Sequence, residues 1–279
     1  MKLGLGTVQF GIDYGVYNKS KIISDFEVNK ILNTANKFKI SYIDTAQDYG
    51  NSEKKIGKFD TSDFKIITKI SKDVHYDDVR KSIEGSLNRL KVKKVNGVLI
   101  HSFSHFIKNN RVYKKLIDLK KKGLILNIGF SLYYPEELKY LLDNKIDFDF
   151  IQIPYNIFDR RFESYFEFLK SVNIEIHVRS VFLQGLFFID PLNLSNFFRH
   201  HINHFISFRN EIQKNKISVQ SACLNYVCNN EYINCVLIGV ENNNQLVENI
   251  NAIDNKLNLK FLDKFKINDE KILLPYNWK

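Results

Sequence analysis

The feature that most constrains the fold is a regular alternation of short apolar runs with longer segments of helical periodicity. The first apolar run, residues 3–6, is followed by Val28, Ile31, Leu32 and Ala35, which share one face of a helix. The same alternation continues to the end of the chain. The predicted strands are residues 3–6, 42–44, 64–69, 97–100, 124–130, 150–153, 174–178 and 235–238.

Strands that alternate with helices indicate a parallel sheet, because parallel strands need crossover connections. The eight predicted strands and their helices fit within 279 residues, near the usual size of a (β/α)8 TIM barrel, roughly 250 residues. A doubly wound open α/β sheet is the alternative. No linker rich in Pro or Gly interrupts the pattern. We therefore expect one barrel domain over residues 1–279, with a tail from about residue 254 folding over one end.

The overall composition argues against several classes of partner. No apolar run approaches the roughly 20 residues that a membrane span needs, and the first residues do not resemble a secretory signal, so we expect a cytoplasmic protein. The net charge of +10 is mostly Lys spread along the chain, whereas base recognition and phosphate forks favour Arg. We expect no nucleic-acid partner. Cys223, Cys228 and Cys235 fit no disulfide framework or zinc spacing, which predicts buried thiols and no metal.

Ionisable residues stand at the ends of three consecutive predicted strands. Asp44 ends the second strand, Lys69 ends the third, and His101 follows the fourth, while Tyr49 comes five residues after Asp44. The carboxyl ends of barrel strands meet at one mouth, where barrel enzymes hold their active sites. We therefore expect these four side chains to lie together.

The chemistry of such a cluster is proton transfer to a carbonyl oxygen, without a metal. Asp44 can pair with a buried Lys69. A cationic Lys69 beside Tyr49 would stabilise the phenolate and lower the Tyr49 pKa from about 10, so that the phenol can donate a proton near neutral pH. His101 can hold the same oxygen by a hydrogen bond. Structural roles stay open: a helix cap for Asp44, a rim aromatic for Tyr49, a surface ion pair for Lys69 and a core imidazole for His101.

Residues 42–53 resemble the signature of the aldo-keto reductase family, in which an Asp and a Tyr have the spacing of Asp44 and Tyr49. The strand ends at Lys69 and His101 also resemble that family, and the similarity extends over nearly the whole chain. The resemblance implies a catalytic tetrad of these four residues, with Tyr49 as general acid and His101 orienting the carbonyl. It further implies an NAD(P)H-dependent oxidoreductase that reduces an aldehyde or ketone, a sugar-derived carbonyl among them, and acts as a monomer.

The resemblance also implies a set of cofactor contacts at strand ends and in the loops after them. They are Gly6, Thr7, Asp44, Ser131, Gln152, Arg179, Ser180, Leu183, Gln184, Gly185, Gly239, Val240, Gln245, Glu248 and Asn249. Gln152 would bind the nicotinamide carboxamide. Leu132 stands where the family has an Asn, so one amide contact is missing. Arg179 stands where the family often has an aromatic side chain, and its planar guanidinium can stack on the nicotinamide similarly.

The choice between NADPH and NADH rests on two opposing arguments. Members of the family more often use NADPH, whose 2'-phosphate needs Lys or Arg near Gly239 and the last helix. Residues 239–245 contain no basic residue, and Glu241 would repel a phosphate. Because a Lys from another segment could serve, the balance favours NADPH, with better use of NADH than is usual in the family.

Substrate contacts are expected from aromatic residues in the loops after the strands. The candidates are Phe10, Tyr14, Phe103, Tyr155 and Trp278, all of which could instead be packing residues. Apolar walls of this kind suit many small-molecule carbonyl substrates. Two other functions stay open at this stage: a nicotinamide-nucleotide-binding barrel without turnover, and a barrel aldolase that forms a Schiff base on Lys69.

Overall fold

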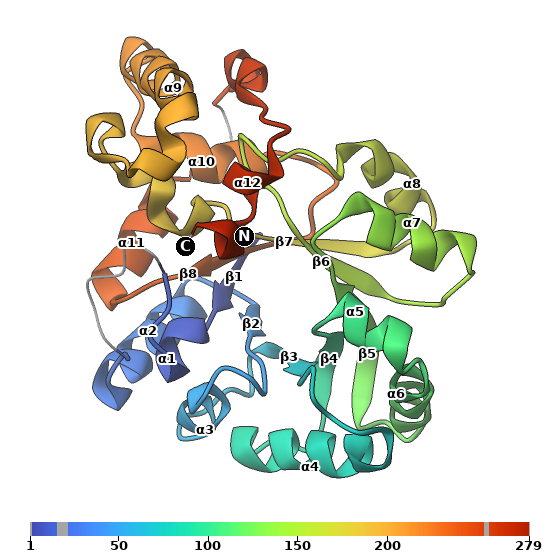
Figure 1. The fold of residues 1–279 in the computed structure, drawn as a ribbon. Helices are drawn as coiled ribbons and strands as arrows, with labels where there is room; N and C mark the ends of the chain where they lie inside the picture. The colour runs from blue at the N-terminus through green and yellow to red at the C-terminus, as the bar shows by residue number, and fades with distance from the viewer. Residues whose placement is uncertain (1, 16–21, 254–256, 279) are drawn as a thin grey trace.

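Eight short strands rich in Ile, Val and Leu form the centre of the structure, a computed structural model that describes residues 2–15, 22–253 and 257–278. The strands are Leu3–Gly6 (β1), Tyr42–Asp44 (β2), Lys65–Ile70 (β3), Val95–Ile100 (β4), Ile125–Ser131 (β5), Phe150–Pro154 (β6), Glu175–Arg179 (β7) and Cys235–Gly239 (β8). They lie at the middle of Figure 1, with helices around them.

Each strand pairs in parallel with the strand before it, and β1 pairs with β8, so the sheet closes into a barrel. The closing register sets Leu3 opposite Val236 and Gly6 opposite Gly239. The prediction of a single-domain (β/α)8 barrel is confirmed. The doubly wound alternative is wrong, because an open sheet would leave two unpaired edges.

The helices alternate with the strands as the periodicity predicts. The α-helices are Val8–Gly11 (α1), Asp25–Lys37 (α2), Ser52–Ile56 (α3), Val79–Leu90 (α4), Phe103–Lys108 (α5), Arg111–Lys121 (α6), Pro135–Asp143 (α7), Phe166–Ser171 (α8), Ile202–Lys214 (α9), Val219–Cys228 (α10), Asn243–Asn251 (α11) and Glu270–Leu273 (α12). Short 3-10 helices span Tyr76–Asp78 (η1), Glu163–Tyr165 (η2), Leu183–Phe188 (η3), Pro191–Asn193 (η4), Asn196–His201 (η5), Lys260–Phe265 (η6) and Pro275–Asn277 (η7). None of the described helices is long and apolar enough to cross a membrane.

Local sequence signals explain where individual helices begin. The Ser24 hydroxyl accepts a hydrogen bond from the backbone N–H of Glu27 at 3.3 Å, which caps α2. Pro135 occupies the first turn of α7, where its missing N–H costs no helical hydrogen bond. The buried face of α2 contains Val28 and Ile31, two of the residues that predicted the helix.

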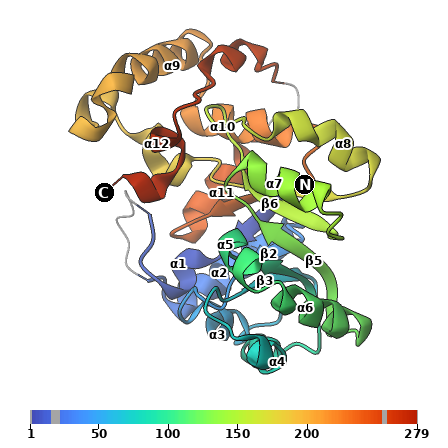
Figure 2. The same cartoon turned by 45° about the vertical axis from the view of Figure 1, so that its right-hand side comes forward.

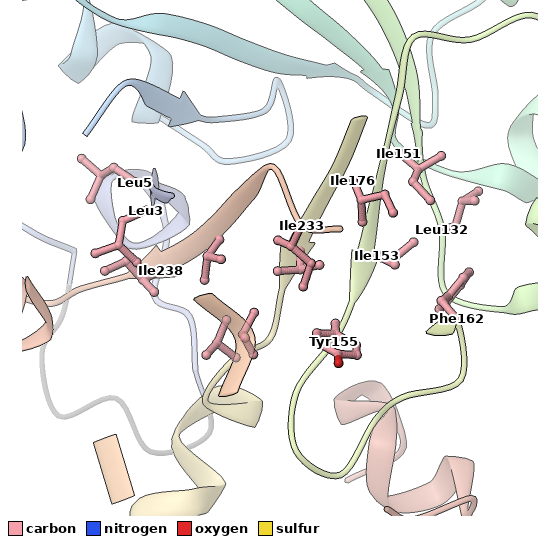
Figure 3. Packing of buried hydrophobic residues seen from close by; sticks show 14 of the residues in the cluster. Leu3, Leu5, Leu132, Ile151, Ile153, Tyr155, Phe162, Ile176, Ile233 and Ile238 are labelled. Atoms are coloured by element: carbon pink, nitrogen blue, oxygen red, sulfur yellow. The ribbon is translucent and has the colours of Figure 1, made fainter. Parts of the chain in front are cut away.

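Two apolar layers hold the barrel together. The larger one lies between strands and helices; Figure 3 shows part of it, with Ile151, Ile153 and Tyr155 among the residues packed there. The second is a small cluster of Ile67, Leu99 and Phe150. Since these three come from β3, β4 and β6, which are not all neighbours, they meet inside the barrel. Burying both faces of a parallel strand requires near-continuous apolar runs, which the sequence has.

Because side chains alternate along each strand, the inner apolar cluster lies directly beneath the polar residues near the carboxyl ends of the strands. Side chains alternate between the two faces of a strand, so a residue two positions after an inward one also points inward. Lys69, His101 and Gln152 stand two positions after Ile67, Leu99 and Phe150. The polar residues at the carboxyl ends therefore form the next layer, directly above a dry apolar one.

The segment carrying Tyr49 is fixed by an unusually close backbone approach. A Cβ atom on Gly11, at the end of α1, would lie only 1.7 Å from the Tyr49 carbonyl oxygen. Gly50 has φ +53°, in the left-handed region that favours glycine. Beneath this contact the buried Ser52 hydroxyl lies 2.9 Å from the Thr7 carbonyl oxygen and 3.0 Å from the Thr45 hydroxyl.

The C-terminal segment packs over residues that follow strand ends. The Tyr276 ring lies 5.7 Å from the Tyr133 ring, and its hydroxyl is hydrogen-bonded to the Tyr134 hydroxyl. The Trp278 ring meets Phe198 edge to face at 5.3 Å. In Figures 1 and 2 this segment, drawn in red, lies on the side of the molecule that carries α9. Residues 254–256 of the predicted tail lie outside the described residues.

We predict that Gly11→Ala lowers the free energy of unfolding by about 1–3 kcal/mol, the usual cost of forcing a methyl group into a closely packed site. Urea unfolding followed by circular dichroism measures it. The control is Gly85→Ala in α4, where the nearest atom to the new Cβ belongs to the flexible Arg89 side chain. Ala is the better helix former there by about 1 kcal/mol. Equal stabilities for the two variants would contradict the assigned close approach.

Candidate active site

A buried ion pair stands at the carboxyl ends of β2 and β3. The Lys69 ammonium donates to the Asp44 carboxylate and, at 3.0 Å, to the Thr45 carbonyl oxygen. Lys69 is 1% exposed and Asp44 is 4% exposed, so neither charge is solvated by bulk water. Each charge therefore depends on the other, because an unpaired buried charge costs several kcal/mol.

The second oxygen of Asp44 extends the pair across the barrel. The side-chain N–H of Gln152, in the middle of β6, donates to Asp44 Oδ2 at 2.7 Å. Asp44 thus links a residue of β3 to one of β6, and the three side chains form one hydrogen-bonded chain. The side-chain carbonyl oxygen of Gln152 takes no part in this bond. Ser131, at the end of β5, is buried and is the strand partner of Gln152.

Tyr49 lies against the same ammonium group. Lys69 Nζ is 4.8 Å from the centre of the Tyr49 ring and lies over its face. The predicted cluster of Asp44, Tyr49 and Lys69 is therefore present in the structure. Its signal in the sequence was the position of each residue at, or just after, a strand end.

The direction of the Tyr49 pKa differs from the prediction. Burial raises the pKa of the Tyr49 phenol, and the negative charge of Asp44 raises it further. The nearby positive charge that lowers the Tyr49 pKa is that of Arg179. Burial also lowers the pKa of Lys69, which Asp44 opposes. Tyr49 is thus a fully protonated phenol at neutral pH.

His101 completes the cluster at the end of β4. Its ring meets the Tyr49 ring edge to face, with centroids 5.9 Å apart. Burial lowers the His101 pKa below its usual range, so the imidazole is neutral near pH 7. His101 Nδ1 lies 3.3 Å from Asp48 Oδ2. Sequence reasoning missed Asp48, although it stands beside Tyr49 in the signature stretch.

Arg179 forms the opposite wall of the site at the end of β7. One of its N–H groups donates to the Leu132 carbonyl oxygen at 3.1 Å, and the guanidinium carbon lies 4.1 Å from the centre of the Tyr133 ring. Tyr133 therefore covers one face of the guanidinium and leaves only the other for a ligand. Tyr133 was not predicted, because nothing in its local sequence marks it as a partner of Arg179.

The loop after β7 has an irregular backbone. Ser180, Leu183, Gln184 and Gly185 have φ of 62°, 47°, 52° and 89°, all in the left-handed region. Such strain is concentrated in loops that meet ligands. The Gln184 side chain donates to the Tyr14 hydroxyl at 2.9 Å, which connects this loop to the one after β1. Tyr14, a predicted substrate contact, therefore lies beside the loop after β7.

The last of the predicted cofactor contacts along the chain lie on β8, on α11 and between the two. Gly239 pairs with Gly6, and Val240 is buried. Two of these predicted contacts already have partners within the protein. The Gln245 side chain accepts from the Glu241 N–H at 2.8 Å, and the Asn249 side chain accepts from Gln220 at 2.6 Å. Glu248 is exposed.

An open cavity of about 520 Å³ adjoins the start of α11. It is lined by Glu27, Lys30, Asn33 and Thr34 of α2 and by Asn242, Asn243 and Asn244. The Asn243 N–H donates to the Glu27 carboxylate at 2.6 Å. The cavity therefore combines one carboxylate and one ammonium group with a row of amides.

Five predicted contacts have other roles in the structure. Phe10 and Tyr155 are 0% and 2% exposed and lie in the core, so they offer no surface to a substrate. Phe103 packs against the Tyr140 ring, and the Trp278 N–H donates to the Lys271 and Ile272 carbonyl oxygens. Thr7 is fully buried, and its hydroxyl donates to the Asp44 carbonyl oxygen. An aromatic residue near a strand end predicts proximity, but it does not predict which way the ring faces.

Glu53 is a third residue that sequence reasoning did not single out. Its buried carboxylate accepts from the Thr68 hydroxyl at 2.6 Å and from Arg89 at 2.7 Å. It therefore anchors the signature stretch to β3 and α4. The three cysteines are free and buried, as predicted. No group of three or more His, Cys, Asp or Glu within the described ranges could hold a metal ion.

Comparisons with known proteins agree with this geometry. The family model described as "Aldo/keto reductase family" matches residues 2–270. The uncharacterized oxidoreductase YqkF of Bacillus subtilis (strain 168) is 24% identical over 277 residues, which cover 90% of this chain and 86% of YqkF. Both the sequence and the fold of the chain thus have counterparts over nearly their whole length.

Two solved structures are similar over most of the chain. The putative aldo-keto reductase PA4992 from Pseudomonas aeruginosa is 26% identical with a TM-score of 0.69, covering 90% of this chain and 88% of its own. The holo form of aldo-keto reductase AKR11C1 from Bacillus halodurans is 18% identical with a TM-score of 0.73, covering 95% and 90%. The second likeness concerns the fold alone.

We predict that Lys69→Met lowers the free energy of unfolding by about 3–5 kcal/mol, because it leaves Asp44 as an unpaired buried charge. Chemical denaturation at neutral pH measures it. The double variant Asp44→Asn/Lys69→Met removes both charges and should recover most of the loss. A cost below about 1 kcal/mol for the single variant, the value of an exposed pair, would show that the two charges are solvated.

Proposed function

The chain belongs to the aldo-keto reductase family, and we propose that it reduces an aldehyde or ketone, with a nicotinamide nucleotide as hydride donor and Tyr49 as proton donor. The family makes it an oxidoreductase. The observation that carries the finer proposal is the buried group at the ends of β2 and β3, in which the Lys69 ammonium binds Asp44 and lies over the Tyr49 ring.

Tyr49 has the protonation state that a donor needs. Because burial and Asp44 raise its pKa, the phenol holds its proton until a substrate oxygen gains negative charge. Proton transfer then leaves a phenolate, which the positive charge of Arg179 stabilises. This charge acts in a site of low dielectric, where such stabilisation is largest.

The residues at the ends of β5 to β7 fit a nicotinamide nucleotide. Gln152 has a carbonyl oxygen that its bond to Asp44 leaves unused, and Ser131 is its neighbour across the two strands. These two groups would hold the carboxamide, and the open face of Arg179 would border the ring. Residues 180–185 would cover the pyrophosphate. When bound, the nucleotide supplies the hydride, and the protein residues orient it and exclude water.

The charges beside α11 support comparable use of NADH and NADPH. Glu27 accepts from the first N–H of α11, where an anion is otherwise favoured, and Glu241 adds a second negative charge nearby. Lys30 lines the same cavity and can pair with a phosphate. It is the basic residue from another segment that NADPH use requires. The opposing charges leave NADPH with only a small advantage over NADH.

We predict that Tyr49→Phe abolishes carbonyl reduction while the affinity for the nucleotide stays nearly unchanged, since the substitution removes one hydroxyl. Fluorescence titration with NADH and NADPH measures binding. Loss of nucleotide absorbance with a panel of aldehydes measures turnover. Tyr140→Phe, on the exposed side of α7, is the matched control and should keep full activity. Retained kcat in Tyr49→Phe would refute the assignment of the proton donor.

For the wild-type protein we predict kcat/KM values for NADPH and NADH that differ by about tenfold or less. Glu27→Gln should shift the ratio toward NADPH by roughly fivefold, because one like charge near the 2'-phosphate contributes about 1 kcal/mol. Glu84→Gln, on the exposed face of α4, should leave the ratio unchanged. A preference for NADPH beyond a hundredfold in the wild type would contradict the proposal.

A further inference from the structure

The positive charge of the chain is concentrated in one segment, contrary to the even spread that its frequent lysines suggest. Residues 89–122 run from the end of α4 through β4 and α5 to the turn after α6. They contain eleven Lys or Arg residues and one acidic residue, Asp118, so their net charge of +10 equals that of the whole chain. The remaining residues carry thirty basic and thirty acidic side chains and are therefore neutral together.

Most of these positive charges have no counter-ion within the protein. Arg89 pairs with Glu53, and Lys120 pairs with Asp149. No carboxylate among the described residues forms an ion pair with the other nine, which are Lys91, Lys93, Lys94, Lys108, Arg111, Lys114, Lys115, Lys121 and Lys122. We call these nine residues the basic face. Like charges this close repel one another, and an external anion offsets that repulsion.

The helix α6 provides the centre of the basic face. Its apolar side chains are buried against the barrel, and the side turned to water carries Arg111, Lys114, Asp118 and Lys121. At 1.5 Å per residue this exposed row is about 15 Å long. α4 packs against α6, and both helices lie on the side of the molecule away from α9 in Figures 1 and 2. The basic face therefore covers one side of the barrel.

Two turns extend the basic face at one end of α6. The Val95 N–H donates to the Leu124 carbonyl oxygen at 3.1 Å, which brings the turn after α4 beside the turn after α6. The lysines in and next to these turns are all exposed: Lys91, Lys93, Lys94, Lys121 and Lys122. Both turns follow the C-terminal ends of helices, where the backbone carbonyls favour cations.

The surroundings of the basic face fit a lipid surface better than a nucleic acid. Ile107 and Leu126, just before Lys108 and after the turn that ends α6, are 47% and 40% exposed. Proteins that bind single strands stack bases on exposed aromatic rings. The Tyr76 ring beside α6 is instead covered by basic groups, with Arg111 at 4.0 Å and a lysine at 5.1 Å from its centre. A second copy of the chain offers no matching negative charge, since the remaining residues are neutral together.

We propose that the basic face binds the surface of a bilayer that contains anionic phospholipids, so that the protein lies on the bilayer without crossing it. Clusters of about four to eight Lys or Arg residues are typical of such binding. The ammonium groups meet the lipid phosphates, and Ile107 and Leu126 add apolar contacts at the acyl boundary. Because barrel helices run along the outside of the strands, this orientation leaves the mouth of the barrel open to water. The proposal does not depend on the proposed function.

Co-sedimentation with vesicles tests the proposal on the full-length protein. One set of vesicles is pure phosphatidylcholine, and the other is an equal mixture of phosphatidylcholine and phosphatidylglycerol. We expect binding to the mixed vesicles alone. Raising the salt from about 0.1 M to about 1 M shortens the Debye length from about 10 Å to about 3 Å and should release the protein.

The variant Lys93→Gln/Lys94→Gln/Lys114→Gln/Lys121→Gln removes four exposed charges of the basic face. We expect its partition onto the mixed vesicles to fall by about 25-fold or more. Each Lys near an anionic surface contributes roughly fivefold, so this loss needs only two of the four to lie within reach of the lipid. Circular dichroism and urea unfolding establish that the variant is folded.

The matched control is Lys214→Gln/Lys216→Gln/Lys260→Gln/Lys266→Gln, which has the same net charge. These exposed lysines lie at the end of α9 and around η6, which packs against α9. The control should keep the wild-type partition. An equal loss in the two variants would overturn the proposal, because net charge rather than the basic face would then decide binding.

Two results with the wild-type protein would also overturn the proposal, whether or not either variant folds. One is a failure to bind the mixed vesicles at low salt. The other is binding to a single-stranded oligoribonucleotide without binding to vesicles, which would assign the basic face to a nucleic acid.

Discussion

The ion pair between Lys69 and Asp44 is the interaction on which the rest of the site depends. Both groups are almost fully buried above the dry cluster of Ile67, Leu99 and Phe150. Without water, the pair persists only because other hydrogen bonds satisfy it: the Thr45 carbonyl oxygen accepts from Lys69, and Gln152 donates to Asp44. The same dryness raises the Tyr49 pKa and makes nearby charges effective at stabilising a phenolate.

The position of Tyr49 relative to that pair is set by the segment around it. Gly11 and Gly50 let the backbone of this segment lie directly against α1. The hydroxyls of Thr7, Thr45 and Ser52 bond to one another underneath it, and Glu53 ties its far end to Arg89 of α4. A loop fixed at both ends and from below can hold a phenol in one place, which proton transfer requires. Most of the signature stretch is therefore structural support for a single reacting side chain.

The far side of the mouth supplies charge and the surroundings of a ligand. Arg179, which lies against the Tyr133 ring, provides a positive charge that lowers the Tyr49 pKa. On the near side, Asp48 Oδ2 lies 3.3 Å from His101 Nδ1. Charged groups at the mouth of the barrel thus also come from residues outside the Asp44, Tyr49 and Lys69 group. The sequence motif alone did not predict how these residues are arranged around Tyr49 and His101.

The sequence alone determined the barrel and the meeting of Asp44, Tyr49, Lys69 and His101. The barrel follows from local properties, because residues close together in the sequence determine the strand and helix periodicities. The four side chains meet because parallel strands end at one edge of the sheet. Only the tertiary structure decided that Tyr49 is a weaker acid than usual, that Asp48 faces His101, and that Tyr133 covers Arg179. It also placed Phe10 and Tyr155 in the core. These outcomes depend on burial and on distances between segments far apart in the chain, which no local pattern encodes.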